Sequence, residues 1–456
     1  MRKLSILTCL VLLASPLGLT PANAANAATP KLGGACSKIG SFGDTPKARY
    51  ICSQSGQKNI WKLWTPPLPN NNSANNGNKG SGNAGGSQST QGNPQVFKSA
   101  QGGKSIIEAP IPIALPIPQS TDPNELTFAN VINHVSDIPQ AAWKKVQAVL
   151  ASNPAVKIPS QIWVGPTTKL DITGGVSKVQ EVLDRSAKFW NGFSQSKYIS
   201  VYFYNYADEP LAEKQLLDVT KNRKYNPDLE GLLGAMKAGC SKTDCTWGGS
   251  SQVPGTDDGQ MMSGQSGTNT HRLTLDGAGI TGDYIHLIEG AQWIGNKNCT
   301  AGKNCDENSL MHVFSPCWIT SGPEFYFGLA LTDTTYKSYL SDRWNLAFDM
   351  GPTHATDYSQ PSLRNYLFTE SPATCYKDTS RGSSFMLGPN VGALVTEMLT
   401  AISGPQSIMA VEALGGRGQD FPTAFKNVYG ISWSDASTIL SKVLAAEYES
   451  FPPPPK

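Results

Sequence analysis

Residues 284–293, YIHLIEGAQW, and residues 316–326, PCWITSGPEFY, are the two stretches that decide the fold. The pattern of apolar residues from about position 280 onward is mainly helical. His286 and Glu289 are three residues apart, so on a helix their side chains can share a face. The first stretch therefore predicts a helix on which His286 and Glu289 share a face.

Together the two stretches resemble the paired motifs of the gluzincin metallopeptidases, specifically the peptidase MA-like family. That family has H-E-x-x-H-x-x-Q on one helix and W-L-x-E-G-x-A-x-Y on the next. Ile285-His286 corresponds to the start of the first motif, and Gln292 falls near its end. Trp318, Gly322 and Tyr326 correspond to the second motif. The resemblance implies a metallopeptidase-like domain.

Three of the four groups that the family's chemistry uses are replaced. The resemblance places the first zinc ligand at His286, the general base at Leu287, the second histidine at Gly290 and the third ligand at Ser321. One imidazole cannot hold zinc tightly, and without a base no metal-bound water is activated. We therefore expect a pseudoenzyme with no cofactor. The residues of its vestigial cleft would be His286, Leu287, Glu289, Gly290, Ser321 and Tyr326.

A shifted metal site is the alternative. His286 and Glu289 can share a helix face, Glu324 lies one turn after Ser321, and His312 lies between the two motifs. These side chains could form a His-Glu-Glu or His-His-Glu zinc site of an active hydrolase, although an inverted H-x-x-E-H motif lacks its last histidine here. A plainer interpretation is that Glu289 is hydrogen-bonded within the former cleft and His286 is a satisfied, semi-buried residue.

The rest of the main domain predicts an α+β fold with strands early and helices late. We expect an amphipathic helix over 175–193 and a strand over 198–204. A further helix should run from 387 to 402 and end at Gly404-Pro405, and two or three short helices should follow over 405–449.

Features outside the two motifs extend the resemblance to roughly residues 130–450. The family continues with a helix opened by Gly and Ser and then a "G…AF…fG" segment. This chain has Gly382-Ser383-Ser384, Ala424-Phe425 and Tyr429-Gly430 in that order. The match is better after residue 280 than before it.

At the N-terminus the residues follow the order of a secretory signal peptide. Arg2 and Lys3 precede an apolar run from Leu4 to Leu13, and a small-residue stretch with an A-x-A site follows, so we expect residues 1–24 to be removed. The run is shorter than the ~20 residues that cross a bilayer, which predicts a secreted chain with no membrane span. Without residues 1–24 the formal charge falls from +2 to 0, which gives no basis for binding nucleic acid.

Eight cysteines remain after the signal peptide, an even number that favours disulfides in an exported chain. A zinc site would need CxxC-type spacing, and the sequence has none. Cys240–Cys245 would pin a long loop over 240–275, which is rich in Gly, Ser, Thr and Asp. By proximity we expect the pairs Cys36–Cys52, Cys240–Cys245, Cys299–Cys305 and Cys317–Cys375.

Ahead of the main domain, which we place at 125–450, lie three further segments. Residues 29–64 predict a small disulfide-stapled β-hairpin module that resembles a short module of exported proteins from high-GC Gram-positive bacteria. Residues 65–105, dominated by Asn, Gly, Ser and Gln, predict a disordered linker. Residues 106–122, in which Pro alternates with apolar residues, predict an extended strap.

Taken together, these features predict a secreted pseudo-peptidase that acts by binding a peptide, an extracellular partner protein or a cell-wall polymer. The small module has six basic residues and one acidic residue, which suits an anionic wall polymer and equally suits a solvated spacer. No G-x-S-x-G elbow in the folded domain, P-loop or dinucleotide fingerprint points to another enzyme class. The alternatives are an active metal-dependent hydrolase and a structural envelope protein without a specific ligand.

Overall fold

A computed structural model describes residues 111–224, 233–294, 314–348, 357–369 and 387–451, with short gaps inside the second range. Near the N-terminus it describes residues 31, 34–35, 42–45, 48–55 and 58–63. The chain divides into two compact units, residues 15–90 and a larger unit that contains residues 91–456, and each is described by itself. The predicted signal peptide and the linker over 65–105 lie outside the described residues.

The smaller unit contains a three-stranded antiparallel sheet. Its strands are β1 (Phe42–Thr45), β2 (Ala48–Ser55) and β3 (Lys58–Leu63), in the order β1-β2-β3. β2 and β3 span the two strand-like runs of the sequence and pair with Gln54 opposite Asn59. β1 was not foreseen, because its four residues include Gly43 and Asp44, which are poor strand formers. Cys36 lies outside the described residues, so its bond to Cys52 stays a prediction.

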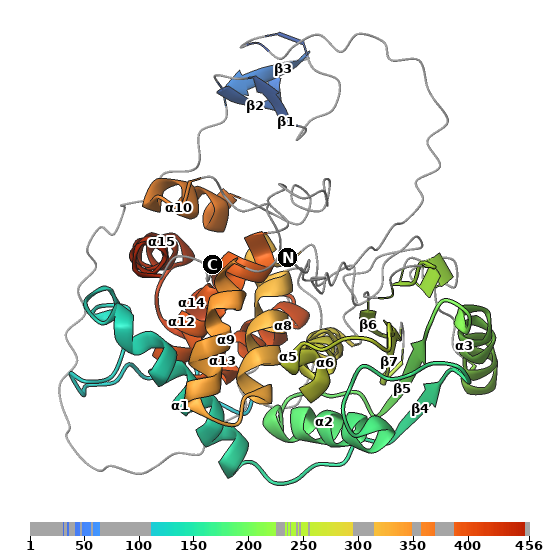
Figure 1. Cartoon of the computed structure of the whole chain (residues 1–456). Helices are drawn as coiled ribbons and strands as arrows, with labels where there is room; N and C mark the ends of the chain where they lie inside the picture. Colours follow the sequence, from blue (N-terminus) through green and yellow to red (C-terminus); the bar gives the residue numbers. More distant parts are fainter. Residues whose placement is uncertain are drawn as a thin grey trace, which may run out of the picture. The chain divides into compact units, whose positions relative to one another are not determined.

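The larger unit is built on a four-stranded mixed sheet (Figure 1). Its strands are β4 (Ser160–Val164), β5 (Tyr198–Tyr204), β6 (Gly248–Gln252) and β7 (Asp258–Gly264), in the order β4-β5-β7-β6. β4, β5 and β7 are parallel, and β6 runs antiparallel to β7 at the edge. The strand predicted over 198–204 is confirmed as β5.

Helices cover both faces of this sheet. Ile199, Val201 and Phe203 of β5 face the main hydrophobic core, which includes α2 (Gly175–Phe189), the helix predicted over 175–193. Tyr202 and Tyr204 point to the opposite face and pack in a second core with α3 (Glu209–Arg223). Successive side chains of β5 therefore enter different cores, and the strand is buried on both faces.

The long loop predicted over 240–275 is wrong, because this segment contains β6, β7 and the short helix α5 (Arg272–Asp276). β7 is a central strand whose residues are mostly buried, so no alternation of polar and apolar residues marks it. Its small residues also allow the helix that carries Leu287 to pack close to the strand, since a Cβ on Gly259 would lie 3.0 Å from Cδ1 of Leu287. The predicted Cys240–Cys245 disulfide just before β6 is confirmed.

The remaining helices confirm the α+β class, with the sheet early and the helices late. Before the sheet come η1 (Val131–Asn133), η2 (Val135–Asp137) and α1 (Ile138–Ser152). After it come α6 (Ala278–Ala291), α8 (Cys317–Thr332), α9 (Tyr336–Phe348), α10 (Gln360–Thr369), the π-helical turn η4 (Gly388–Gly392), α12 (Ala393–Ser403), α13 (Gln406–Gly416), α14 (Phe421–Tyr429) and α15 (Trp433–Ser450).

Two further sequence predictions are confirmed, one for a late helix and one for the segment that precedes the domain. η4 and α12 form the helix expected over 387–402, which ends at Gly404 with a φ of 82°. The segment before the domain is an extended strap over its described part, in which Ile111, Ile113 and Leu115 pack against the core and Ile117 donates its N–H to the carbonyl of Val428 at 2.8 Å. None of the described helices is long and apolar enough to cross a membrane.

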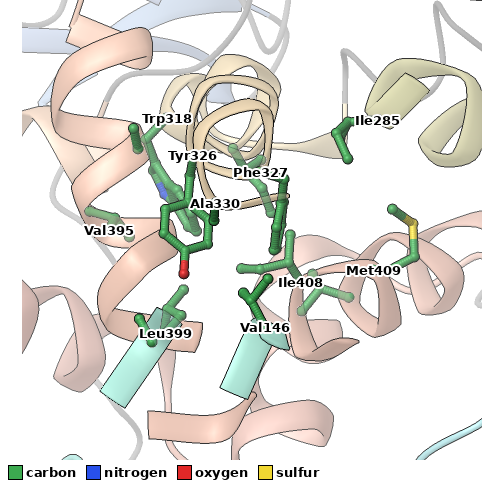
Figure 2. Close-up of a cluster of buried hydrophobic side chains, with 14 of the residues drawn as sticks. Val146, Ile285, Trp318, Tyr326, Phe327, Ala330, Val395, Leu399, Ile408 and Met409 are labelled. Atoms are coloured by element: carbon green, nitrogen blue, oxygen red, sulfur yellow. The ribbon is translucent and has the colours of Figure 1, made fainter. Parts of the chain in front are cut away.

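The core of the helical half is centred on α8. Figure 2 shows Trp318, Tyr326 and Phe327 of α8 among apolar side chains that include Val395 and Leu399 of α12. Burying large aromatic side chains in this way removes on the order of 150–250 Å² of each from water. α8 is thus fixed on one side by α12, and its other side is left for α6.

Candidate functional site

α6 and α8 approach each other through small residues, and this contact assembles the site. A Cβ on Gly282 of α6 would lie 3.0 Å from Cγ of Glu324, and a Cβ on Gly328 of α8 would lie 3.0 Å from the carbonyl oxygen of Ala278. Helices this close bring side chains that are far apart in the sequence into direct contact. Glu324 therefore reaches His286, although 38 residues separate them.

His286 lies between two carboxylates. Its Nδ1 is 3.1 Å from Oε2 of Glu289, one turn later on α6, and its Nε2 is 3.1 Å from Oε2 of Glu324 on α8. All three side chains are buried, with 5% of His286, 2% of Glu289 and 5% of Glu324 exposed. We refer to Glu289, His286 and Glu324 as the acid–imidazole trio.

This arrangement favours the protonated form of the imidazole. Burial alone would lower the pKa of His286, but the Glu324 and Glu289 carboxylates outweigh burial and hold the pKa well above its usual value. Burial raises the pKa of Glu289, against the opposing effect of its bond to His286. With both ring nitrogens protonated, each N–H donates to one carboxylate, and the cation offsets their negative charge.

Two more buried acids surround the trio. Burial, with a contribution from Glu324, raises the pKa of Asp283 on α6 to about 7. Burial, with a contribution from Glu289, raises the pKa of Glu412 on α13 to about 8. Glu412 accepts hydrogen bonds from Nε1 of Trp293 at 3.1 Å and from Oγ of Ser315 at 2.9 Å.

The sequence analysis missed Asp283 and Glu412. The available signal was a single acid inside an otherwise apolar helical run, as in AGITGDYI and SIMAVEAL. An acid at such a position either is buried with partners or has a perturbed pKa.

The other residues predicted for the cleft lie elsewhere. Leu287 packs against β7, as its distance to Gly259 shows, and Tyr326 points into the apolar cluster of Figure 2. Ser321 lies against Gly388 of η4, with its Cβ 3.2 Å from the place of a Cβ there. Gly290 is buried in α6, and His312 lies outside the described residues.

Two further sequence predictions concern Gln292 and the last cysteines. The Gln292 amide donates to the carbonyls of Ser194 and Ile288, and the residue stands six positions after His286, where the family motif has seven. Cys317 is disulfide-bonded, while Cys375 lies outside the described residues. Cys299 and Cys305 lie outside them too, so both pairings stay predictions.

The residues present do not fit the zinc ion that the gluzincin resemblance implies. Leu287, Gly290 and Ser321 supply neither a base nor a ligand at the family's positions. The two glutamates bond to opposite sides of the imidazole, so the three side chains do not converge on one point. Within the described ranges, no group of three or more His, Cys, Asp and Glu side chains is arranged to hold a metal ion.

The buried acids predict that the protein is more stable in mildly acidic than in mildly basic solution. A carboxyl group whose pKa is higher in the folded chain binds an extra proton on folding. Its contribution to stability is full below the unfolded pKa, which is 4.5 for Glu412, and is lost as the pH rises through the folded value of about 8. Each pH unit in that window costs about 1.4 kcal/mol per extra proton.

Glu412→Gln tests this expectation, because glutamine resembles the protonated acid and can bond to Trp293 and Ser315. We expect the variant to be more stable than the parent by roughly 3–4 kcal/mol near pH 8, and nearly equal to it near pH 5. Thermal unfolding at both pH values would measure this. Glu449→Gln makes the same charge change at an exposed position and should alter neither value. Equal effects of Glu412→Gln at both pH values would refute the assignment.

Comparison of the chain with protein-family models, with curated proteins and with solved structures found no match. The geometry of the trio is therefore the basis for assigning a function.

Proposed function

We propose that the chain is a secreted binding protein built on a gluzincin-like framework in which the acid–imidazole trio has replaced the catalytic metal site. The observation that carries this proposal is the occupation of both nitrogens of His286 by carboxylates at 3.1 Å. A metal ligand must offer a lone pair, and an imidazolium has none. A metal would have to displace a proton that two acids hold in place.

The arrangement of the helices and the sheet supports the framework. α6 lies against the edge strand β6, where Oγ of Ser250 donates to the carbonyl of Asp283 at 2.6 Å. α8 crosses α6 and carries the second motif, with Trp318 and Tyr326 in the core beneath it. This is the order of parts that the resemblance implies, with the two motif helices side by side next to the sheet.

A peptide or an extended segment of a partner protein is the ligand class that suits this framework. β6 ends the sheet among the described strands, and an edge strand offers unpaired backbone N–H and C=O groups to an added strand. The small N-terminal module, with its excess of basic residues, suits an anionic cell-wall polymer. Both ligands belong to the extracellular space that the signal peptide implies.

Elemental mass spectrometry of the purified mature chain tests the loss of the metal site. After dialysis against zinc-containing buffer and desalting, we expect well below one equivalent of zinc and no cleavage of unfolded casein. About one equivalent of zinc that is lost in Glu324→Gln would overturn the proposal. That result would instead support the shifted site of His286, Glu289, His312 and Glu324 and an active hydrolase.

A further inference from the structure

A pocket separate from the trio lies at the carboxyl ends of β5 and β7. It is small and partly open to solvent. Phe203 of β5, Ser263 of β7, Gly248 of β6, and Ile280 and Asp283 of α6 line it. None of the three members of the trio is among the lining residues.

Asp283 is the acid of this pocket whose carboxylate is free to meet a ligand. Only 7% of it is exposed, and no donor in the described part of the chain bonds to its carboxylate. The other acid of the pocket, Asp171, accepts the backbone N–H groups of Ser266 at 2.9 Å and Asn269 at 3.2 Å. The oxygens of Asp283 are not among the enclosed side-chain atoms that lack a partner, so they face the pocket, where a partner from outside the chain can reach them.

Space for that partner exists beside Oδ2 of Asp283. A Cβ on Gly248 would lie 3.2 Å from the carbonyl oxygen of Met262, 3.4 Å from Oδ2 and 3.5 Å from Oγ of Ser263, so a side chain at this position would occupy the space next to these oxygens. Ile172, Phe203 and Ile280 supply apolar wall around it. The pocket thus combines one acidic acceptor with apolar walls.

We propose that this pocket binds an organic cation, an alkyl ammonium or alkyl guanidinium group, whose N–H donors pair with Asp283 and whose alkyl chain packs on Ile172, Phe203 and Ile280. Such a group satisfies the carboxylate with a charge-assisted hydrogen bond and buries its own stem. A metal ion fits less well, because two carboxylates, one of them already satisfied, leave too few ligands.

The cation can be a free amine or the basic side chain of a peptide. Gly248 is the first residue of β6, so a peptide added to this edge would place side chains near the pocket. The assignment to a peptide rests on the proposed binding function, whereas the cation site itself does not. The zinc content therefore tests the proposed binding function, and amine binding tests the cation site.

Titration of the mature chain with butylammonium and butylguanidinium, followed by calorimetry or NMR shifts, tests the site. We expect saturable binding of both cations and none of butanol. Binding should be weaker by at least about tenfold in Asp283→Asn, which removes the charge, and in Gly248→Ala, which fills the space. Asp218→Asn, at an exposed position on α3, is the matched control and should bind as the parent does. A peptide with blocked termini and one lysine, compared with the same peptide carrying norleucine, then shows whether the pocket binds the basic side chain of a peptide or only a free amine.

Thermal unfolding of the same variants shows whether Asp283 serves to bind a ligand or to stabilise the fold. Asp283→Asn should melt at or above the parent's temperature, because burial and the Glu324 carboxylate disfavour the charged form of Asp283 and raise its pKa. No saturable binding to the parent chain, or an unchanged affinity in both Asp283→Asn and Gly248→Ala, would overturn the proposal.

Discussion

Replacing His286 with alanine is expected to lower the free energy of unfolding by about 3–5 kcal/mol near neutral pH, because it leaves two buried carboxylates without their shared cation. Glu289 and Glu324 are almost fully buried and bond to opposite sides of the ring. Removing the ring takes away both hydrogen bonds and opens a cavity between the acids. Urea unfolding monitored by tryptophan fluorescence measures the loss.

The loss should also depend on pH. Without the imidazolium, the folded pKa of Glu289, which burial already raises, lies still further above its unfolded value. Stability then falls as the pH rises between those two values, by about 1.4 kcal/mol per proton and pH unit. The parent has one cation that already compensates these charges, so its stability falls less steeply. The variant should therefore be closest to the parent near pH 5.

Two controls test whether the loss of stability in His286→Ala comes from the uncompensated carboxylates. Adding Glu324→Gln to His286→Ala should recover part of the loss near neutral pH, because one uncompensated charge is gone. His271→Ala, at a partly exposed histidine before α5, should change stability by less than about 0.5 kcal/mol. If His286→Ala proved equally mild, the trio would not be the charged unit that its geometry indicates.

Sequence periodicity located the elements whose burial is regular. β5 alternates between two cores, α2 has one apolar face, and α12 ends at a glycine with positive φ, so each has a local signal. β6 and β7 have none, because small residues line a close contact with α6 and burial removes the alternation. Packing against other elements, rather than propensity, makes these residues strands.

The candidate site was predictable only within one helix. The spacing of His286 and Glu289 places them on one face of α6, which the sequence shows directly. Their contact with Glu324 depends on how closely α6 and α8 cross, and that distance is set by Gly282 and Gly328. Glu412 lies on α13, and no local pattern connects it to Glu289. Only the tertiary structure explains why the pKa values of Glu289 and Glu412 are raised.

Introducing a methyl group where α8 meets η4 is expected to have the second large effect. A Cβ on Gly322 would lie 2.3 Å from the carbonyl carbon of Gly392, and a Cβ on Gly392 would lie 2.3 Å from the carbonyl oxygen of Trp318. All of these partners are backbone atoms, so no side chain can rotate away and the helices themselves must separate. Separation would loosen the apolar cluster around Trp318 and Tyr326 that α8 and α12 share.

We therefore expect Gly322→Ala and Gly392→Ala each to lower the free energy of unfolding by at least about 3 kcal/mol, the upper end for overpacked cores. The matched control is Gly234→Ala, where a Cβ would meet nothing within 4 Å and the backbone φ is not positive. That change should be neutral or slightly stabilising, since alanine has a higher helix propensity than glycine. Thermal unfolding, or the soluble yield where a variant does not fold, measures all three. A Gly322→Ala chain as stable as Gly234→Ala would mean that α8 and η4 do not meet backbone to backbone.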